Sequence, residues 1–340
     1  MINRNVRNCS RSASLSDCRT SPIGGYFELE LPDKRGLPYP EAQGFQSARA
    51  AFFALIRAGR PKRIWMPRYS CDAMFAPLEH ENIECMWYDV NDQLVVDQNL
   101  EIETNDWLLY VNYFGVCSKQ AEELIRRLSP DQVVLDYSQA FFAPPQEEVL
   151  ATVYSPRKFF GVPDGGLLIS KIPIEVPKEQ DANSFKRMSH LIRRLGDCPQ
   201  AGFDDFKRAE ESLTEIEPKR MSLLTTRILS SIDYEKASKK RSENFFFLHE
   251  MLSEKNKLAV DVSCVAAPLC YPFLASDPGL RKRLINSGIF IATYWPDAIG
   301  RVNEDWSEKM VRKLLPLPID QRYGAREMQR IAAIILGDEA

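Results

Sequence analysis

The sequence predicts an α/β fold, in which helices cover both faces of a large, mainly parallel sheet and a smaller α+β region follows. Short apolar segments with the length of buried strands alternate with helical segments through the first half of the chain, which is typical of such sheets. The 340 residues suffice for one large domain and one smaller domain. We expect a flexible leader over 1–23, a large domain over 24–200, and a helical connection with a small C-terminal domain over 201–340.

The first half of the chain supplies the sheet. A helix is predicted over 47–58, because apolar residues such as Phe52 and Leu55 recur at helical spacing and Ser47 is suited to cap its start. Strands are expected over 63–66, 83–88, 107–112, 132–136, 152–155 and 167–171, with further helices over 70–80 and 119–128. Ligands of parallel sheets bind at the carboxyl ends of the strands, so residues that follow these strands are the first candidates for a site.

The second half of the chain predicts a different arrangement. Residues 180–254 read as charged helices, with breaks at Pro199 and Pro218. Strands are expected over 259–273, 287–295 and 314–318, and helices over 278–286 and 325–336. Two groups of basic residues are interpreted first as solvated helix faces and, as the alternative, as a grip for an anionic ligand: Lys186, Arg187, Arg193 and Arg194, then Lys239, Lys240 and Arg241.

Composition narrows the class of protein. Hydrophobic residues make up 44% of the chain and charged residues 27%, as in ordinary soluble enzymes. The net charge of -3 gives no reason to expect a nucleic acid or an anionic membrane as partner. No apolar run approaches the ~20 residues that span a bilayer. We therefore expect neither a nucleic acid nor a membrane as partner.

Cysteine and histidine usage points to a reduced compartment and no metal. The eight cysteines contain no C-x-x-C pair, which favours free thiols in a cytoplasmic protein. None of the three histidines has a second ligand at metal-binding spacing, so no metal site is expected. The arginine- and serine-containing first twenty residues are faintly like a transit peptide, but they lack an amphipathic apolar face, which favours a disordered leader.

Lys158 and Asp136 are the leading catalytic candidates. Lys158 stands among aromatic and apolar residues shortly before Gly165-Gly166, and apolar surroundings favour the neutral amine that condenses with an aldehyde to a Schiff base. Asp136 ends an apolar strand, 22 residues earlier. A pyridoxal phosphate enzyme needs a lysine for the Schiff base and an acid on the pyridine nitrogen. Taken singly, the lysine reads as a solvated surface residue and the aspartate as a turn or cap residue.

Other residues are candidates for holding such a cofactor. Gln139 could bond a ring oxygen, and Ser155 could bind phosphate, although a surface amide and a turn cap are the plain alternatives. The helix start at Ser47-Ala-Arg49 offers backbone N–H groups to an anion, as any helix start does. Tyr113, which follows a strand, could line the pocket or simply be packed. The phosphate-binding glycine motifs and the G-x-S-x-G elbow are absent from the sequence.

Taken together, these pieces resemble the DegT/DnrJ/EryC1/StrS family of pyridoxal phosphate-dependent sugar aminotransferases, which have fold type I. Six segments match in the family's order, and the last of them, Leu315-Pro-Leu-Pro318 with the final helix, resembles the family's closing L-P-[LIV]-[HP] strand and helix. Ser47-Ala-Arg-Ala-Ala51 resembles S-G-T-A-A, Met66-Pro-Arg-Tyr-Ser-Cys71 resembles P-x-[YF]-T-x, Tyr113-Phe-Gly115 resembles [HLY]-Y-G, Leu135-Asp-Tyr-Ser-Gln139 resembles E-D-A-A-[QH], and Lys158 keeps the spacing to its Gly-Gly. The resemblance runs from about residue 24 to 336.

The resemblance implies a role for each matching residue. Lys158 forms the Schiff base (an aldimine) and moves protons, Asp136 pairs with the ring nitrogen, and Gln139 lies near the ring hydroxyl. The amides of Ala48 and Arg49, together with Ser155, would hold the phosphate. Cys71 stands where an aromatic residue usually stacks on the ring, so Tyr69 or Tyr113 is the alternative stacking partner. Leu135 replaces the family's usual glutamate, and no clear match to the family's cross-subunit asparagine loop is found.

The function expected from this resemblance is transfer of an amino group from an amino acid, glutamate by preference, to a nucleotide-linked keto-sugar in surface-polysaccharide biosynthesis. The resemblance also implies a homodimer with its active sites at the subunit interface. Two alternatives stay open. One is a non-catalytic or regulatory protein with the same fold, suggested by Cys71 and Leu135. The other is a different reaction such as sugar dehydration, although those relatives carry histidine where this chain has Lys158.

Overall fold

The structure of the chain, a computed structural model, describes residues 23–215 and 217–337. The chain divides after Pro32 into two units. In the first unit, the described residues 23–32 contain no helix or strand. The leader expected over 1–23 lies outside the described residues except for its last position. All the elements below belong to the second unit, and the domain boundary expected near residue 200 stays a prediction.

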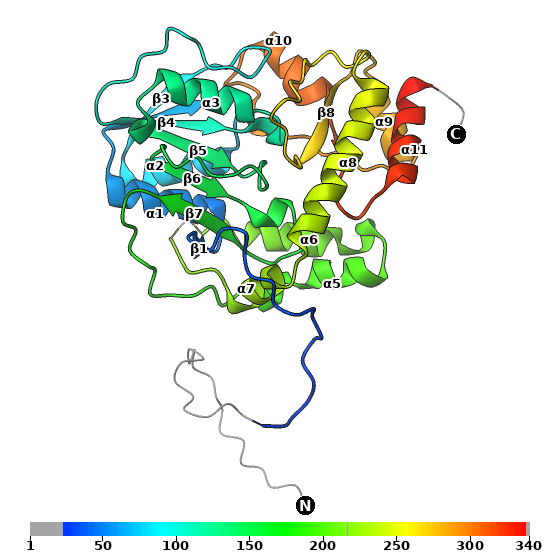
Figure 1. Cartoon of the computed structure of the whole chain (residues 1–340), viewed down its shortest axis with the longest axis horizontal. Helices are drawn as coiled ribbons and strands as arrows, with labels where there is room; N and C mark the ends of the chain where they lie inside the picture. Colours follow the sequence, from blue (N-terminus) through cyan, green and yellow to red (C-terminus); the bar gives the residue numbers. More distant parts are fainter. Residues whose placement is uncertain (1–22, 216, 338–340) are drawn as a thin grey trace, which may run out of the picture. The chain divides into compact units, whose positions relative to one another are not determined.

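A seven-stranded sheet forms the centre of the second unit (Figure 1). Its order is β1-β7-β6-β5-β4-β2-β3, and every neighbouring pair from β6 to β3 is parallel, whereas β7 is antiparallel to both of its neighbours. The expected mainly parallel sheet is therefore confirmed. The strands are β1 Gln43–Phe45, β2 Arg63–Pro67, β3 Glu84–Tyr88, β4 Asp106–Val111, β5 Val133–Tyr137, β6 Ala151–Tyr154 and β7 Gly166–Ser170.

Both faces of the sheet are covered, because successive strand residues point to opposite sides. In β4, Leu108 belongs to one hydrophobic core cluster and Leu109 to the other. Helix α1 (Ala48–Gly59) packs Phe52 into the cluster that contains Leu109, and α3 (Ser118–Arg127) packs Leu124 into the opposite one. Both helices were expected, and Ser47 caps α1 as the sequence predicts, since its Oγ accepts from the N–H of Ala50 at 3.1 Å.

The helix expected over 70–80 is broken into two short pieces. These are the 3₁₀ turn η1 (Asp72–Met74) and α2 (Ala76–Glu81), with Pro77 in the first turn of the second piece. Proline lacks an N–H and is tolerated in a first helical turn but not in the interior of a helix. A single helix through this segment is therefore excluded.

The second half of the chain combines helices with a small two-stranded sheet. The helices are α4 Ser184–Arg187, α5 Ser189–Gly196, α6 Phe203–Glu211, α7 Leu223–Ser230, α8 Tyr234–Leu252, α9 Leu280–Asn286, α10 Glu304–Trp306 and α11 Ala325–Leu336. Strands β8 (Cys270–Leu274) and β9 (Leu314–Pro318) pair antiparallel, and α8 lies against α11 (Figure 1). Single turns complete the chain: η2 Tyr113–Gly115, η3 Pro130–Gln132, η4 Pro156–Lys158, η5 Pro199–Gly202, η6 Pro296–Ala298 and the π-helical η7 Ser307–Lys313.

Two strand predictions in this half are wrong. Only Cys270–Leu274 of the segment 259–273 is a strand, and 287–295 forms none. In 287–295 the side chains do alternate, with Ile289 and Ile291 buried and Phe290 exposed. However, Arg281 of α9 donates to the carbonyl oxygens of Ile291 and Ala292, at 3.3 and 2.9 Å. The Arg281 side chain thus occupies backbone carbonyl oxygens that would otherwise accept hydrogen bonds from a neighbouring strand.

The interpretation of the basic groups as solvated faces is wrong at two positions. Arg187 is 3% exposed and Arg241 is 1% exposed. Arg187 forms a bidentate ion pair with Asp181, at 2.8 and 2.9 Å. Arg241 instead bonds only neutral oxygen atoms, which are described below. Lys186, Arg193 and Arg194 are exposed, as expected.

Candidate functional site

One edge of the large sheet gathers nearly all the residues that the sequence singles out. The parallel strands β2, β4, β5 and β6 end at this edge, and the antiparallel β7 begins there. The register places Asp136 beside Val111 on one side and Val153 on the other. Tyr69 and Cys71 therefore follow β2, Tyr113 follows β4, and Ser155 and Lys158 follow β6, all at this edge.

Asp136 is a fixed carboxylate with one oxygen available. It is 6% exposed, and its Oδ1 accepts from the N–H of Ser138 at 2.8 Å. Within 23–215 and 217–337, no hydrogen-bond donor is found for its Oδ2. Its carbonyl oxygen accepts from the N–H of Asn112 at 3.0 Å, which ties the end of β5 to the loop after β4. The side chain is suited to accept a hydrogen bond from a protonated ring nitrogen.

Gln139 holds a donor ready for a ligand. Its Oε1 accepts from the N–H of Phe114 at 2.6 Å, which fixes the amide plane. Its Nε2 is buried and has no partner among the residues that the structure describes. A buried donor without an acceptor is costly, at about 1–3 kcal/mol. An oxygen atom of a bound ring would remove this cost, so the residue fits its expected place near a ring hydroxyl.

Lys158 is exposed, so the expected burial of this lysine against apolar surface is wrong. The one-turn helix η4 explains its direction. Phe159 and Phe160, the next two residues, are 3% and 7% exposed and turn into the core. The N–H of Lys158 donates to the carbonyl oxygen of Ser155 at 3.2 Å. The aromatic neighbours therefore anchor the backbone and leave the amine accessible.

A buried arginine holds the carbonyl group of Phe159, the residue that follows Lys158. The guanidinium of Arg241 lies 4.5 Å from the ring centroid of Phe159 and donates to the Phe159 carbonyl oxygen at 3.5 Å. Gln321 accepts from Nε of Arg241 at 2.8 Å and donates to the same carbonyl at 2.9 Å. Burial lowers the pKa of Arg241 to about 10. The backbone of the candidate lysine is thus gripped from α8 and from the segment after β9.

The start of α1 lies against the start of β7. A Cβ atom at Gly166 would lie 2.2 Å from the carbonyl carbon of Ser47, so only glycine permits this approach. The first N–H groups of a helix, here at Ala48 and Arg49, have no acceptor within the helix. Ser155, at the end of the neighbouring β6, is 7% exposed. Backbone amides at a helix start and a serine hydroxyl suit a phosphate group.

The two tyrosines considered as stacking partners are packed away. Tyr69 is 2% exposed and Tyr113 is 0% exposed, and their rings stack on each other with centroids 5.6 Å apart. The ring of Trp295 lies edge-on to both, at 4.7 and 5.5 Å. The hydroxyl of Tyr69 donates to the Met310 carbonyl at 3.0 Å. Cys71, which is half-buried, remains the residue at the position expected for ring stacking.

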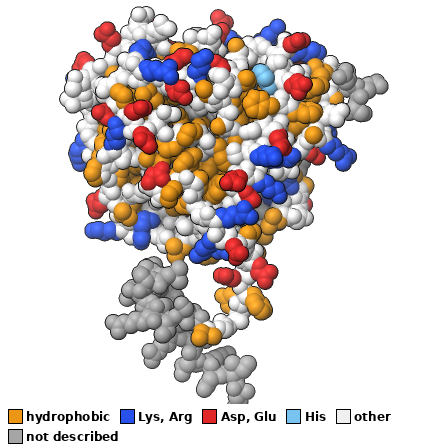
Figure 2. All heavy atoms as spheres, in the orientation of Figure 1, with side chains coloured by type: hydrophobic (Ala, Val, Ile, Leu, Met, Phe, Trp, Pro, Cys, Tyr) orange, Lys and Arg blue, Asp and Glu red, His pale blue; other side chains and the backbone are white. Residues whose placement is uncertain are grey.

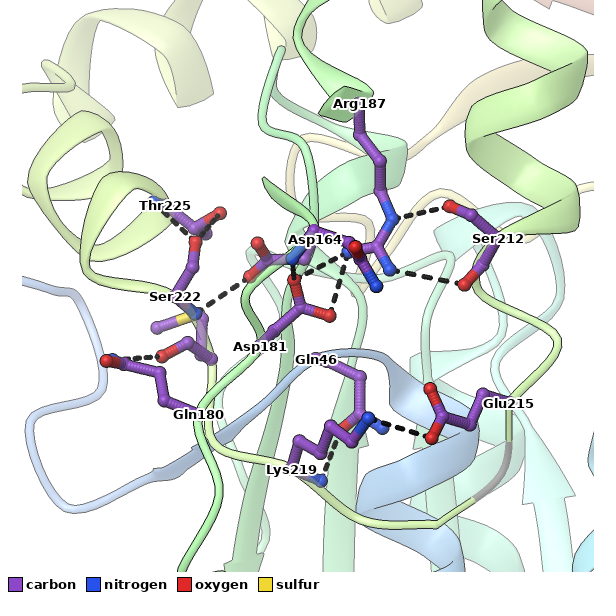
Figure 3. Close-up of polar contacts among 12 residues, drawn as sticks. Gln46, Asp164, Gln180, Asp181, Arg187, Ser212, Glu215, Lys219, Ser222 and Thr225 are labelled. Carbon is purple, nitrogen blue, oxygen red and sulfur yellow. Dashed lines mark hydrogen bonds and ion pairs between the residues drawn. The ribbon is translucent and has the colours of Figure 1, made fainter. Parts of the chain in front are cut away.

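A buried polar network surrounds the turn between Lys158 and β7 (Figure 3). Asp164, which precedes Gly165, is fully buried, and its Oδ1 accepts from the N–H of Ser222 at 3.1 Å. Burial raises the pKa of Asp164. Nearby, Arg187 pairs with Asp181 and donates to Oγ of Ser212 at 2.6 Å. The first bond ties the Gly-Gly turn to the start of α7, and the bonds of Arg187 tie the end of α6 to α4 and to Asp181.

Some residues of this site were missed by sequence reasoning. Asp164 had a signal, since it directly precedes the glycine pair that was recognised. Arg241 was noted only as part of a basic group and Gln321 had no signal, because they lie 83 and 163 positions after Lys158 and only the fold brings them to it. Ser47, Ser155, Asp136, Gln139 and Lys158 all reach the predicted edge.

Three properties of the described residues bear on the kind of site that they form. No group of three or more His, Cys, Asp or Glu side chains that could hold a metal ion is found there. The six cysteines of the described part of the chain are free. No described helix is both long and apolar enough to cross a membrane.

The fold is shared with solved aminotransferases. A DegT DnrJ EryC1 StrS aminotransferase from Brucella abortus matches with a TM-score of 0.60 and 13% identity over 87% of this chain and 85% of that chain. Helicobacter pylori PseC, an aminotransferase of pseudoaminic acid biosynthesis, matches with 0.57 and 16% over 87% and 86%. Spr1654 from Streptococcus pneumoniae in its PLP-form matches with 0.60 and 13% over 87% and 86%.

No protein-family model and no curated protein matches the chain. At identities of 13–16%, the solved structures establish the fold. The expected fold type I architecture is therefore confirmed over most of the chain.

Proposed function

We propose that the chain is a pyridoxal phosphate-dependent aminotransferase, which moves an amino group from an amino acid to a nucleotide-linked keto-sugar. The observation that carries the proposal is the arrangement of Asp136, Gln139 and Lys158 around one sheet edge. The amine is accessible, one carboxylate oxygen is available and the amide donor lacks an acceptor among the described residues. The solved proteins with this fold include sugar aminotransferases, which supports the reaction class.

The residues at this edge suit each part of the cofactor. Asp136 would accept a hydrogen bond from the ring nitrogen, and Nε2 of Gln139 would donate to the ring hydroxyl oxygen. The first turn of α1, with Ala48 and Arg49, and the hydroxyl of Ser155 would hold the phosphate. Cys71 would lie against the ring. When bound, pyridoxal phosphate supplies an electron-withdrawing ring that stabilises negative charge on the substrate carbon.

The chain's own groups would then perform the proton transfers. Asp136, as a carboxylate, keeps the ring nitrogen protonated and thereby keeps the ring electron-poor. Lys158 is the general base, because its amine is the accessible basic group at this edge, and it removes a proton from one carbon and returns it to another. The grip of Arg241 and Gln321 on the Phe159 carbonyl fixes the backbone from which this amine moves.

Glutamate is the proposed amino donor, and the proposed product belongs to surface-polysaccharide biosynthesis. The name of PseC, an aminotransferase involved in the biosynthesis of pseudoaminic acid, supports a biosynthetic role, and glutamate follows from the family resemblance alone. The net charge of -3 gives no support for nucleic acid as a partner. A cytoplasmic location agrees with nucleotide-linked substrates and with free cysteines in the described part of the chain.

A homodimer is part of the proposal. Figure 2 shows apolar side chains gathered across the middle of one face, with charged side chains around them. Large exposed apolar patches mark interaction surfaces. A second subunit would also shield the exposed Lys158 from bulk water, which protects the reacting groups from side reactions.

The proposal is tested by trapping the cofactor on the chain. Borohydride reduction of the protein with pyridoxal phosphate, followed by peptide mapping, should label Lys158. The Lys158→Ala variant should lose the label and all turnover, whereas Lys186→Ala, a change at an exposed lysine, should keep both. Labelling elsewhere, or turnover by the Lys158→Ala variant, would contradict the assignment.

A non-catalytic role is the second candidate, because Cys71 stands where a stacking ring is expected and Tyr69 and Tyr113 are packed away. Incubation with glutamate separates the two. Conversion of the bound cofactor to its amino form supports the aminotransferase. Bound cofactor that no amino acid converts supports the non-catalytic protein.

A further inference from the structure

Three basic side chains near Lys158 each keep a buried nitrogen that lacks a hydrogen-bond partner in the described part of the chain. These nitrogens are Nε of Arg49, Nε of Arg157 and Nδ1 of His190. Arg49 lies in the first turn of α1, Arg157 in η4 immediately before Lys158, and His190 in α5. Unpaired buried donors are uncommon in native proteins. The Nε–H groups of Arg49 and Arg157 are obligatory donors and therefore require an acceptor, and Nδ1 of His190 is a third donor in the tautomer that carries its proton there.

One carboxylate, that of Glu210 near the end of α6, lies beside this group of side chains. Glu210 forms an ion pair with Arg157. Burial lowers the pKa of Arg49 and of His190, and the nearby charge of Glu210 opposes both shifts. Arg49 donates to the carbonyl oxygen of Thr214 at 3.1 Å, just beyond α6. Glu210 is thus paired with Arg157, and no carboxylate of the described residues pairs with Arg49, which leaves positive charge uncompensated.

The position of Glu210 is fixed by the fold, although its side chain is free to leave. Two residues further on, Ser212 accepts from Arg187 through its hydroxyl at 2.6 Å and through its carbonyl at 3.2 Å (Figure 3). Arg187 is itself held by Asp181. The backbone at the end of α6 is therefore anchored. The side chain of Glu210 remains 45% exposed and is able to turn into solvent without disturbing the core.

We propose that Arg49, Arg157 and His190 form an oxyanion site for a phosphate monoester, and that Glu210 is an internal counter-ion which the phosphate displaces. The inference rests on the proposed function, because it assigns side chains to the cofactor phosphate. Guanidinium groups bind phosphate through paired N–H donors, and a phosphate dianion brings more charge and more acceptor oxygens than one carboxylate. Arg157 lies between Ser155 and Lys158, and Arg49 lies on the first turn of α1, so the site adjoins both elements proposed to hold that phosphate.

Calorimetric titration of the whole chain with inorganic phosphate tests the site directly. Glu210→Gln should bind phosphate about tenfold more tightly than the natural chain, since a competing charge is removed. Arg157→Gln should bind about tenfold more weakly, and Arg157→Lys should fall between. Glu211→Gln, which removes the exposed carboxylate next along α6, is the matched control and should leave the affinity unchanged.

A second pair of titrations identifies the source of the phosphate group. Pyridoxal 5'-phosphate should follow the same order of variants, pyridoxal without phosphate should not, and excess inorganic phosphate should weaken binding of pyridoxal 5'-phosphate. Equal or weaker phosphate binding by Glu210→Gln, in a variant that melts like the natural chain, overturns the inference. Cofactor binding that ignores these substitutions overturns it too, and leaves the proposed function in place. Phosphate binding in the expected order by a chain that takes no pyridoxal phosphate supports the site and overturns the proposed function.

Discussion

At the scale of single residues, the groups that matter at the sheet edge are those whose bonding is incomplete. Gln139 uses its oxygen inside the protein and keeps its Nε2 free of any described partner. Asp136 likewise uses Oδ1 inside the protein. Each side chain is therefore oriented by one atom and available through the other. Both side chains are therefore already oriented for a polar ligand before the ligand binds.

Substitution of Gln139 should separate these two uses. Gln139→Glu keeps an acceptor for the N–H of Phe114 but loses the donor, whereas Gln139→Leu loses both. We expect both variants to bind pyridoxal phosphate about tenfold more weakly, which corresponds to one hydrogen bond of about 1.4 kcal/mol. Gln139→Leu should also lower the free energy of unfolding because it leaves a buried N–H unpaired, and Gln139→Glu should lower it for a different reason, because it places a carboxylate in a buried position. Fluorescence titration and urea unfolding measure the two effects, and unchanged affinity in both variants would refute the role of Nε2.

Asp164 should make stability depend on pH. Burial raises its pKa above the ordinary value of 3.8, so the folded chain holds this proton more tightly than the unfolded chain does. The stabilising contribution is complete below 3.8 and is lost as pH rises through the folded pKa. Asp164→Asn keeps an acceptor for the N–H of Ser222 and removes the charge. The variant should therefore melt at a higher temperature than the natural chain at neutral pH, with the gap closing in acid. A difference in melting temperature that grows as the pH falls would contradict a raised pKa of Asp164 in the folded chain.

At the scale of elements, the reversed direction of β7 builds the end of the site that we propose to bind phosphate. Because β7 begins at the edge where its neighbours end, the turn before it meets the start of α1. Gly165 bonds Gln46 through its N–H at 2.8 Å, and Gly166 lies directly against Ser47. The contact between residue 166 and Ser47 requires a residue without a Cβ atom at position 166.

Gly166→Ala should displace the first turn of α1. The added carbon would overlap the Ser47 carbonyl group, so we expect a loss of about 1–3 kcal/mol of stability together with weaker binding of pyridoxal phosphate. Gly196→Ala is the matched control, because nothing lies within 4 Å of a Cβ atom there. Urea unfolding of both variants provides the comparison. A neutral Gly166→Ala would show that α1 is able to shift without loss.

The elements that the sequence predicts correctly are those whose pattern is local. Strands β4 and β5 are continuous apolar runs, and α1 and α11 carry apolar residues at helical spacing with recognisable starts. The segment 287–295 shows why the remainder could not be predicted. Its alternation is that of a strand, but a distant arginine occupies its carbonyl oxygens. The prediction that Arg187 and Arg241 lie on solvated helix faces was wrong for the same reason, since each is buried by partners that no sequence pattern places beside it.

At the scale of the whole molecule, Arg241 connects parts of the chain that lie far apart. Its guanidinium reaches the carbonyl oxygens of Pro268 and Leu269 before β8, Gln321 after β9, and Phe159 beside the candidate lysine. No carboxylate of the described residues forms an ion pair with it. The charge is stabilised by contacts with neutral oxygens and with the Phe159 ring, and the more distant Asp320 carboxylate also favours it.

Arg241→Met should destabilise the chain by at least about 2 kcal/mol, because several buried oxygens lose donors that are worth ~1–3 kcal/mol each. Arg126→Met, at a side chain that is 74% exposed, is the control and should change stability little. The Arg241→Met variant should also form its covalent link to pyridoxal phosphate more slowly, since the Lys158 backbone is no longer held. Urea unfolding and stopped-flow absorbance measure the two effects, and a variant as stable as the control would refute the assignment.

The grip on the Phe159 carbonyl has a mechanical consequence. Gln321 follows β9 and Arg241 belongs to α8. A motion of the β8–β9 sheet against the seven-stranded sheet would therefore displace the Phe159 carbonyl, one residue after Lys158. A ligand that draws the two sheets together would therefore shift the backbone beside Lys158 and change the position of its amine as the ligand binds.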